Sequence, residues 1–511
     1  MGRYYITTPL YYVNAEPHIG HTYTTIVADT WARFLRGRGD EVVLTTGTDE
    51  HGDKIAAAAA AAGATPRAHV DRISAVFRQT WDAIGITYDQ FIRTTDPAHR
   101  CNVQEVLARV HAAGDIYFGS YGGLYCIGCE RFYTEKELVD GRCPDHQTVP
   151  VYLAEDNYFF RMSKYQAPLI AYLEAHPEAI TPEQYRNEAL AMLRSEALGD
   201  LCISRPKSRL EWGIELPFDT NYVTYVWFDA LLGYPSALKE RGEQTFARLW
   251  PETHHIIGKD ILKAHAIFWP TMLMAAGMPM FRQLHVHGYW SRGESKMSKS
   301  LGNVVRPLDV QRRFGMEAFR YFLLREMAFG HDAAFSEDLF ITRVNADLAN
   351  NLGNLVSRTL AMQQRYFNGV IQDLGTWTGE DQELAASFET AIREMPAFAE
   401  KLLFHRALES LWRAIDHANK YVVTTSPFTL AKDAAQRPRA GAVLHHLCEA
   451  LYVTAALLAP FLPETAARLF TLLDVVPVAA LPTTWRWGTA LPGEHSTKPP
   501  EILFPRIEVK P

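Results

Sequence analysis

The sequence has few cysteines, no long uncharged apolar run and no excess of positive charge. Six cysteines in 511 residues are too few for the disulfide framework of a small secreted protein. No apolar stretch suggests a membrane-spanning helix, and Met1 to Ile6 resembles a strand more than a leader peptide. The formal net charge of -7 excludes a generally basic surface for nucleic acid. We therefore expect a cytoplasmic protein with no membrane partner, in which any polyanion binds to a local basic surface.

Apolar residues are abundant, and the first of them follow an alternating pattern of strand and helix. Hydrophobic residues make up 48% of the sequence, so we expect more than one core and about two to four domains. Arg3 to Thr8 is predicted to be a strand, a helix follows and ends before Gly37, and Glu41 to Thr46 is predicted to be the next strand. This order favours an α/β fold with a parallel sheet, whose ligands bind beyond the carboxyl ends of the strands.

The middle of the chain interrupts this pattern. Between about residues 116 and 221, short pieces rich in Tyr, Gly, Cys and Pro, with one helical stretch, indicate an insertion between two halves of the sheet. The α/β pattern then resumes, with strands predicted at His254 to Ile257 and at Leu284 to His287. Between these strands, Ile261 to Ala275 is predicted to be helical.

The last third of the chain has a different pattern. After about Met316 strand signals disappear, and apolar residues recur at helical spacing. One such series is Phe404, Leu408, Leu411 and Ile415. This part is therefore predicted to be an α-helical bundle.

A Gly between two histidines follows the first predicted strand. His18, Gly20 and His21 lie where that strand turns into a helix, whose free N-terminal amides favour a phosphate. The small Gly20 lets a flat base approach closely, and two imidazoles can donate to phosphate oxygens. The alternative is a pair of surface histidines on a turn.

A second short motif carries two lysines. The segment Lys296-Met297-Ser298-Lys299-Ser300 follows a Gly-containing lead, so we expect a loop that presents two ammonium groups. Such a loop can close on a triphosphate. A short basic loop that stands alone is more often a solvated surface loop.

A third motif has the spacing of a metal site. Cys126, Cys129, Cys143 and His146 form C-x-x-C followed, after thirteen residues, by C-x-x-H. These residues supply the four ligands of one tetrahedral Zn²⁺. Four protein ligands close the coordination shell, so the site is expected to be structural. The alternative is a set of reduced cysteines without a metal.

The order of these motifs resembles that of the class I aminoacyl-tRNA synthetases. The H-I-G-H segment follows the first strand, an insertion comes next, and K-M-S-K-S follows the last strand. The resemblance implies that an amino-acid carboxylate attacks the α-phosphate of ATP while His18, His21, Lys296 and Lys299 stabilise the phosphate charge. It also implies Mg²⁺ with ATP and transfer of the amino acid to a tRNA.

Four further segments resemble those of the methionyl-tRNA synthetase family. They are Thr8 to Asn14, Gly47 to Gly52, Tyr225 to Ala230 and Gly258 to His265. The resemblance implies that Asp49 binds the substrate ammonium group and that Gly258 and Asp260 meet the adenosine, alongside Gly20. It implies that the methionine side chain is surrounded by Leu10, Tyr12, Trp227, Ala230, Tyr234 and His265. Aromatic walls suit a long, polarizable thioether. Without the resemblance, Trp227 and Tyr234 could be core aromatics and Asp260 a helix cap.

The family resemblance extends to the helical part. Asn350, Asn354 and Arg358 recur at helical spacing and resemble the family's anticodon-reading face, although an exposed polar face is the plain alternative. Phe428 stands where the family has a tryptophan for stacking on a base. The resemblance also implies one zinc knuckle in the insertion.

From this reading we expect a Rossmann-like catalytic domain split by a zinc-knuckle insertion and followed by an α-helical bundle. The expected ranges are 1–115 for the first half of the Rossmann domain, 116–224 for the inserted domain, 225–300 for the second half, 301–348 for the K-M-S-K-S loop and stem-contact region, 349–485 for the anticodon-binding bundle, and 486–511 for a docking tail. The chain has no room for a further dimerising domain, so a monomer is expected. The expected reaction joins L-methionine to tRNA(Met) at the expense of ATP.

Three other functions are consistent with parts of this pattern. A cysteine-specific synthetase shares the two signature motifs, but its metal touches the substrate, whereas all four ligands here lie in one insertion. A small-molecule nucleotidyltransferase of the same superfamily would not explain Asn354 and Arg358. A noncatalytic zinc-stabilised RNA-binding protein would not need His18 or Lys296. The leucine, isoleucine and valine enzymes generally carry an editing domain, for which this insertion is too small.

Overall fold

A computed structural model describes residues 1–126, 131–133, 135–144, 147–292, 295–296, 305–481, 485–491 and 495–508. The chain forms two compact units. The α/β unit consists of Gly2–Ala28 and Val42–His287, and the helical unit consists of Met1, Asp29–Glu41 and Gly288–Pro511.

The α/β unit contains a six-stranded sheet with the order β3-β2-β1-β12-β13-β7. Its strands are β1 (Arg3–Tyr12), β2 (Glu41–Asp49), β3 (Gln90–Arg93), β7 (Ile180–Thr181), β12 (Thr253–Gly258) and β13 (Gln283–His287). β1 pairs in parallel with β12, β12 with β13, and β2 with β3. After β1, the chain first forms β2 and β3 on one side of β1 in the sheet, and later forms β12 and β13 on the other side of β1. The ends of β1 and β12 therefore form the switch point at which such sheets bind ligands.

The predicted strands of the sheet are confirmed, each somewhat longer than the sequence indicated. All residues of β12 are buried, as expected for a central parallel strand covered on both faces. The predicted helical run at Ile261 to Ala275 is divided into three pieces: the 3-10 helix η4 (Lys259–Ile261), the π-helix η5 (Ala264–Phe268) and α10 (Trp269–Ala275). The helices of this unit that precede the insertion are α1 (Ile19–Gly37), α2 (Asp53–Ala61), α3 (Pro66–Ala83) and α4 (Pro97–Ala112). Only the first part of α1, up to Ala28, belongs to this unit.

The insertion is built around an antiparallel pair of long strands. β4 (Ile116–Cys126) pairs with β6 (Val151–Phe160) along most of its length. The prediction of one helical stretch is wrong, because two helices form here: α5 (Gln166–Ala175) and α6 (Glu183–Ser195). Between them, β7 pairs with β13 of the main sheet. Smaller strands complete the region: β5 (Arg131–Tyr133), β8 (Leu201–Cys202), β9 (Ser204–Pro206), β10 (Glu215–Leu216) and β11 (Asp219–Thr224).

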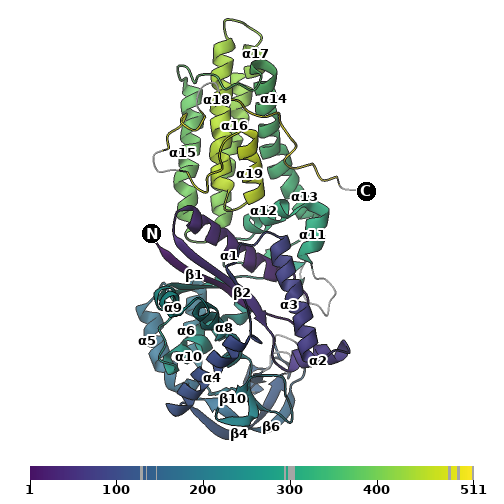
Figure 1. Ribbon diagram of the computed structural model, residues 1–511, viewed down its shortest axis with the longest axis vertical. Coiled ribbons are helices and arrows are strands. Elements are labelled where there is room, and N and C mark those ends of the chain that lie inside the picture. The colour runs from purple at the N-terminus through teal and green to yellow at the C-terminus, as the bar shows by residue number, and fades with distance from the viewer. Residues whose placement is uncertain are drawn as a thin grey trace. The chain divides into compact units, whose positions relative to one another are not determined.

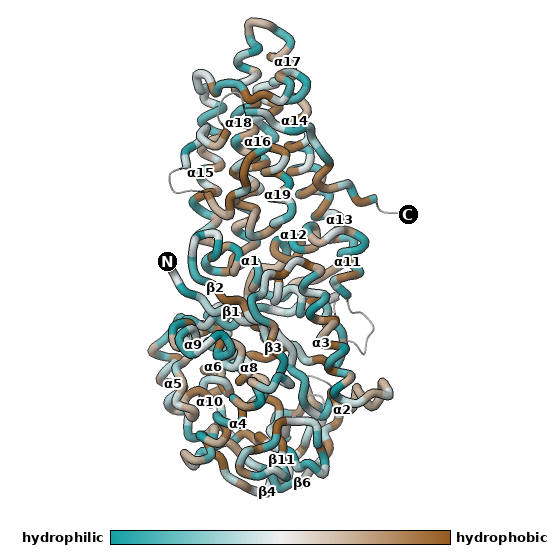
Figure 2. The backbone as a smooth tube through the Cα atoms, viewed as in Figure 1, coloured by the Kyte–Doolittle hydropathy of each residue, from teal (hydrophilic) through white to brown (hydrophobic). Residues whose placement is uncertain are grey.

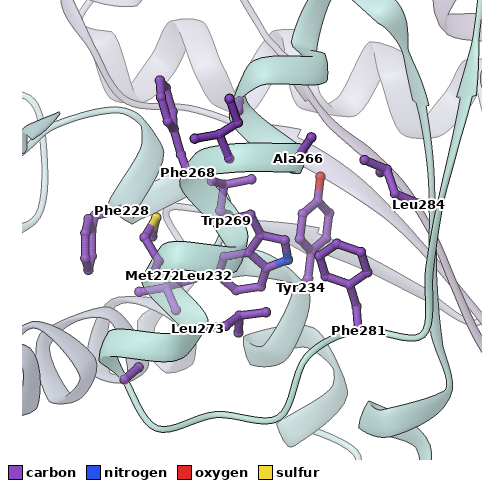
Figure 3. Packing of buried hydrophobic residues seen from close by; sticks show 14 of the residues in the cluster. Phe228, Leu232, Tyr234, Ala266, Phe268, Trp269, Met272, Leu273, Phe281 and Leu284 are labelled. Carbon is purple, nitrogen blue, oxygen red and sulfur yellow. The ribbon is translucent and has the colours of Figure 1, made fainter. Parts of the chain in front are cut away.

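The core of the α/β unit lies around Trp269, which is fully buried. Figure 3 shows Trp269 surrounded by Leu232, Tyr234, Met272 and Leu273. These residues come from α10 and from the helices that follow the insertion, α7 (Trp227–Ala230), α8 (Gly233–Lys239) and α9 (Glu243–Leu249), or from the turns between them. The same packing therefore fixes α7 and α8, which carry predicted site residues.

The helical unit is a bundle, as predicted. Figure 1 shows α14, α15, α16 and α18 side by side along much of their length. Its helices are α11 (Pro307–Phe314), α12 (Met316–Glu326), α13 (Glu337–Arg343), the π-helix η7 (Val344–Gly353), α14 (Asn354–Phe367), α15 (Gly379–Ala399), α16 (Phe404–Thr425), α17 (Pro427–Leu430), α18 (Arg437–Leu458) and α19 (Pro463–Leu472). The predicted series in α16 is confirmed, since Phe404, Leu408, Leu411 and Ile415 are all buried. Figure 2 shows hydrophobic and hydrophilic stretches alternating along these helices.

Strand structure does not vanish after Met316, contrary to the prediction. The short strand β16 (Ala333–Ala334) pairs with β14 (Trp290–Arg292), which also pairs with β15 (Ser295–Lys296). Two-residue strands give no periodic signal, so the sequence could not reveal β16.

Within the described part of the chain, one helix has the length and apolar composition of a membrane span. It is α18, and 94% of its most apolar window is buried inside the protein. Its apolar side chains form the centre of the bundle, where α14, α15, α16 and α19 pack against it.

Candidate active site

Two histidines lie where the chain turns from β1 into α1. The rings of His18 and His21 stack with their centroids 3.7 Å apart. The backbone N–H of Gly20 donates to Nδ1 of His18 over 3.1 Å, and the backbone N–H of His18 donates to Nδ1 of His21 over 3.4 Å. A neutral imidazole whose Nδ1 accepts carries its proton on Nε2. Each ring therefore has an N–H at Nε2, and two such donors beside a helix N-terminus suit a phosphate.

The residues predicted to bind the amino acid all belong to the α/β unit. Leu10 and Tyr12 lie at the end of β1, Asp49 ends β2, Trp227 and Ala230 lie in α7, Tyr234 lies in α8, and His265 lies in η5. Gly233, at the start of α8, lies so close to β1 that an added Cβ would be 2.2 Å from Cδ1 of Leu10. The rings of Trp227 and Phe268 lie 6.1 Å apart, which brings α7 beside η5. These contacts join β1 to α8 and α7 to η5.

Tyr234 and His265 form a buried hydrogen-bonded pair. Nδ1 of His265 lies 3.1 Å from the carbonyl oxygen of Ile261, so this nitrogen carries the proton. Nε2 therefore accepts from the Tyr234 hydroxyl over 2.8 Å. Burial lowers the pKa of His265 to about 4, despite its hydrogen bond to Ile261. Burial also raises the pKa of Tyr234, and the negative charge of Asp49 adds to the rise. The pair is thus neutral at pH 7.

The backbone around Asp49 is fixed on both sides. Gly47 lies against β3, where an added Cβ would be 2.1 Å from the carbonyl oxygen of Ile92. The carbonyl oxygen of Asp49 accepts from the N–H of Val13 over 3.2 Å. The next residue, Glu50, is fully buried. Its carboxylate accepts hydrogen bonds from Thr48, Arg93 and Thr95. Asp49 itself is 6% exposed, and its position is set by these neighbours.

Gly258 and Asp260 lie at the end of β12. Gly258 is the last residue of that strand, and Asp260 lies in η4. An added Cβ at Gly258 would be 2.5 Å from Oδ1 of Asp260, so a larger residue there would require the Asp260 side chain to move. Gly258 is buried and Asp260 is exposed. An exposed carboxylate at the switch point of the sheet can accept hydrogen bonds from ribose hydroxyls.

The predicted lysines lie largely outside the described residues. Lys296 ends the short strand β15 of the helical unit, where it pairs with Ser291, but its side chain is not among those described. Lys299 lies outside the described residues. Both therefore stay predictions from the sequence.

The cysteine motif is described in part. Cys126 and Cys143 are buried in a small cluster with Tyr133. Thr148 joins them, because its hydroxyl lies 3.6 Å from Sγ of Cys126 and its carbonyl oxygen accepts from the N–H of Cys143 over 2.9 Å. Cys129 and His146 lie outside the described residues. Among the side chains that are described, no group of three metal-ligating residues converges.

The predicted anticodon residues lie in the helical unit. Asn350 lies in the π-helix η7, whereas Asn354 and Arg358 lie in α14. All three are exposed, and Nδ2 of Asn354 donates to the carbonyl oxygen of Asn350 over 2.8 Å. Phe428, in α17, is 41% exposed.

One buried cluster near the predicted pocket was missed by the sequence analysis. Asp229, in α7, binds His51 and His99, which lie 178 and 130 residues away in the sequence. No spacing rule joins such distant positions. The only indication in the sequence that these residues matter was that Asp229 and His51 belong to segments resembling those of the methionyl-tRNA synthetase family.

Family models match almost the whole chain. The family described as "tRNA synthetases class I (M)" matches residues 4–150 and 145–360. The family described as "Anticodon binding domain of methionyl tRNA ligase" matches residues 371–510.

Individual proteins give the same result. The methionine–tRNA ligase of Caldanaerobacter subterraneus is 43% identical over 99% of this chain and 79% of its own length. That of Clostridium perfringens is 45% identical over 99% of this chain and 78% of its own length. The Mycobacterium tuberculosis methionyl-tRNA synthetase, solved in complex with methionyl-adenylate, superposes with a TM-score of 0.93 at 39% identity. That superposition covers 99% of this chain and 100% of the other.

Proposed function

The chain belongs to the methionyl-tRNA synthetase family of class I tRNA synthetases, and from this premise we propose which of its residues perform each step. The protein activates methionine with ATP, giving methionyl-adenylate and pyrophosphate. It then transfers methionine to the 3′-terminal ribose of tRNA(Met) and releases AMP. The observation that carries this assignment is similarity over 99% of the chain to methionine–tRNA ligases.

Methionine is held between aromatic side chains and one carboxylate. Asp49 binds the ammonium group, and the neighbouring carboxylate of Glu50 is neutralised by Arg93. Leu10, Tyr12, Trp227, Ala230, Tyr234 and His265 surround the thioether side chain. The hydroxyl proton of Tyr234 is already donated to His265. The pair therefore offers sulfur a polarizable and neutral wall, which suits methionine better than a charged side chain.

ATP is bound at the ends of β1 and β12. Gly20 and Gly258 allow close approach of the nucleotide, and Asp260 accepts from the ribose. The methionine carboxylate attacks the α-phosphorus, and the bond to the β-phosphate oxygen breaks as pyrophosphate leaves. The Nε2–H groups of His18 and His21, with Lys296 and Lys299, stabilise the charge that builds on the phosphates. Mg²⁺ bound with ATP neutralises part of the same charge.

The helical unit selects the tRNA. Asn350, Asn354 and Arg358 offer amides and a guanidinium to unstacked anticodon bases, and Phe428 offers a ring for stacking. All four residues are exposed, so unstacked bases can reach them, as this role requires.

One structural Zn²⁺ fits the cysteine motif. Cys126 and Cys143 are buried cysteines that both contact Thr148, and no disulfide joins them. With Cys129 and His146 they would complete a tetrahedral donor set that orders the tip of β4.

The proposal also includes the domain ranges expected from the sequence, a single chain in solution and a cytoplasmic location. A mass near 57.7 kDa by light scattering would support the single-chain state.

Amino-acid-dependent ATP–pyrophosphate exchange tests the proposed reaction. Wild type should exchange with methionine and with none of the other nineteen amino acids. Lys299→Ala should reduce exchange about a hundredfold or more, because a transition-state contact is lost. Exchange with another amino acid would reject the pocket assignment, and absence of exchange would reject the reaction.

A further inference from the structure

A buried carboxylate joins three elements beside the proposed methionine pocket. Asp229 is 1% exposed and lies in α7. Its Oδ2 lies 2.6 Å from Nδ1 of His51, and its Oδ1 lies 2.7 Å from Nε2 of His99. A carboxylate can only accept, so both of these imidazole nitrogens carry protons. Each oxygen of Asp229 is thus bound by a different element: the segment after β2 and the helix α4.

The partners of Asp229 are themselves held in place. Nδ1 of His99 lies 3.0 Å from Oγ of Ser236, in α8. The same Oγ accepts from Nδ2 of Asn102 over 2.9 Å. His99 is fully buried and His51 is 7% exposed. The ring of His51 also lies 5.4 Å from that of Trp212, whose Nε1–H donates to the carbonyl oxygen of Glu50 over 2.6 Å. The cluster therefore has little freedom to move.

The helix that carries Asp229 begins in an unfavourable backbone conformation. Val226, directly before α7, has a φ of +43°, which a β-branched residue rarely adopts. A strained residue persists only where its surroundings over-determine it. Phe228, next to Asp229, is fully buried and packs against the core shown in Figure 3. Asp229 adds a polar anchor on the same turn of helix, so α7 is held by packing and by hydrogen bonds.

We propose that Asp229 is a positioning residue for the amino-acid substrate, which fixes the wall of the pocket relative to its carboxylate. Trp227 and Ala230, on either side of Asp229 in α7, form part of the wall. His51 follows Asp49, the proposed ammonium ligand, by two residues. By binding His51, Asp229 sets the separation between these two parts of the site. The hydrogen bonds from His51 and His99 support this arrangement. Burial by itself raises the pKa of Asp229, but these interactions lower it to about 2.

The inference rests on the proposed function and is tested by the exchange reaction with Asp229→Asn. An amide cannot accept from both imidazoles, so α7 or the segment after β2 must shift. The KM for methionine should rise about tenfold or more, because a small displacement of a binding group has large effects. The KM for ATP should change less than about threefold, because its proposed contacts lie on β12 and the β1 turn.

Asp115→Asn is the matched control. Asp115 is 3% exposed and also has two partners, Lys164 and Tyr165. Asp115 follows the end of α4, whereas His99, which binds Asp229, lies near the start of that helix. At the usual helical rise, roughly 20 Å therefore separates the carboxylate of Asp115 from that of Asp229. Loss of stability alone should affect both variants, but only Asp229→Asn should raise the KM for methionine.

Variants at His99 provide a second test if Asp229→Asn does not fold. His99→Leu removes one donor to Asp229 and should raise the KM for methionine. His99→Gln keeps an N–H near the position of Nε2, so its KM for methionine should be close to that of wild type. An unchanged KM in folded Asp229→Asn or His99→Leu, or an equal rise in Asp115→Asn, overturns the inference. Absence of exchange by wild type would instead overturn the proposed function.

Discussion

At the scale of single residues, burial keeps the imidazoles of the central sheet neutral. Burial lowers the pKa of His254 and of His255 well below the ordinary value. It lowers the pKa of His285 to about 3. Nδ1 of His254 and Nε2 of His285 lie 3.0 Å apart, so only one of these atoms can carry a proton. Protonation of both rings would break the contact.

This arrangement predicts acid sensitivity that depends on His285. Its pKa is depressed in the folded state, so its contribution is present above the unfolded pKa of about 6.5 and falls as the pH drops toward the folded pKa of about 3. At pH 5.0 the loss relative to pH 7.5 should be about 2 kcal/mol. His285→Gln should therefore show a smaller difference between the urea midpoints measured at these two pH values.

An exposed histidine serves as the control for this measurement. The side chain of His176 is 47% exposed, so His176→Gln should leave the pH difference of wild type unchanged. An equal pH difference in wild type and His285→Gln would show that His285 is not the group responsible.

The residues of the site differ in how far the sequence could reveal them. His18, Gly20 and His21 form a contiguous motif, and its place after a strand was enough to predict its surroundings. Tyr234 and His265 were expected on resemblance alone, because their pairing depends on how α8 packs beside η5. No role could be assigned to Asp229 from the sequence, because His51 and His99 are distant from it in the chain and contact it only in the folded protein.

At the scale of elements, the zinc knuckle makes the sharpest prediction. Purified protein should contain about one zinc per chain by elemental analysis. Cys126→Ser and Cys143→Ser should each abolish this zinc and lower the thermal midpoint, because both thiols are buried at the end of β4. Cys101, an exposed thiol in α4, provides the control, and Cys101→Ser should retain the metal. Zinc retained by both Cys126→Ser and Cys143→Ser would reject the ligand set.

Long periodic elements could be predicted, and short or irregular ones could not. α16 has a sustained apolar series, and β12 is a continuous buried run. β7 has only two residues, Ile180 and Thr181, and its place in the sheet depends on pairing with β13. The π-helices η5 and η7 lie within stretches whose composition is ordinary for an α-helix. Tertiary packing therefore decides where they form.

At the scale of the whole molecule, the sequence predicted the fold class through its alternating first half and helical last third. It could not predict that the inserted segment adds a strand to the main sheet, because that strand is defined by a partner about a hundred residues away. The net charge of -7 also did not point to RNA. Under the proposed function, tRNA is recognised by a few exposed polar groups on the helical unit and not by the electrostatic field of the whole protein.

The initial rate at which methionine is attached to tRNA(Met) tests the proposed function of the whole chain most directly. Wild type should charge tRNA(Met), and Arg358→Ala should lower kcat/KM for the tRNA about tenfold or more without changing ATP–pyrophosphate exchange. Arg393→Ala, which removes another arginine of the helical unit from α15, should behave as wild type. No charging by wild type, or equal charging of a tRNA(Met) with a replaced anticodon, would contradict the account.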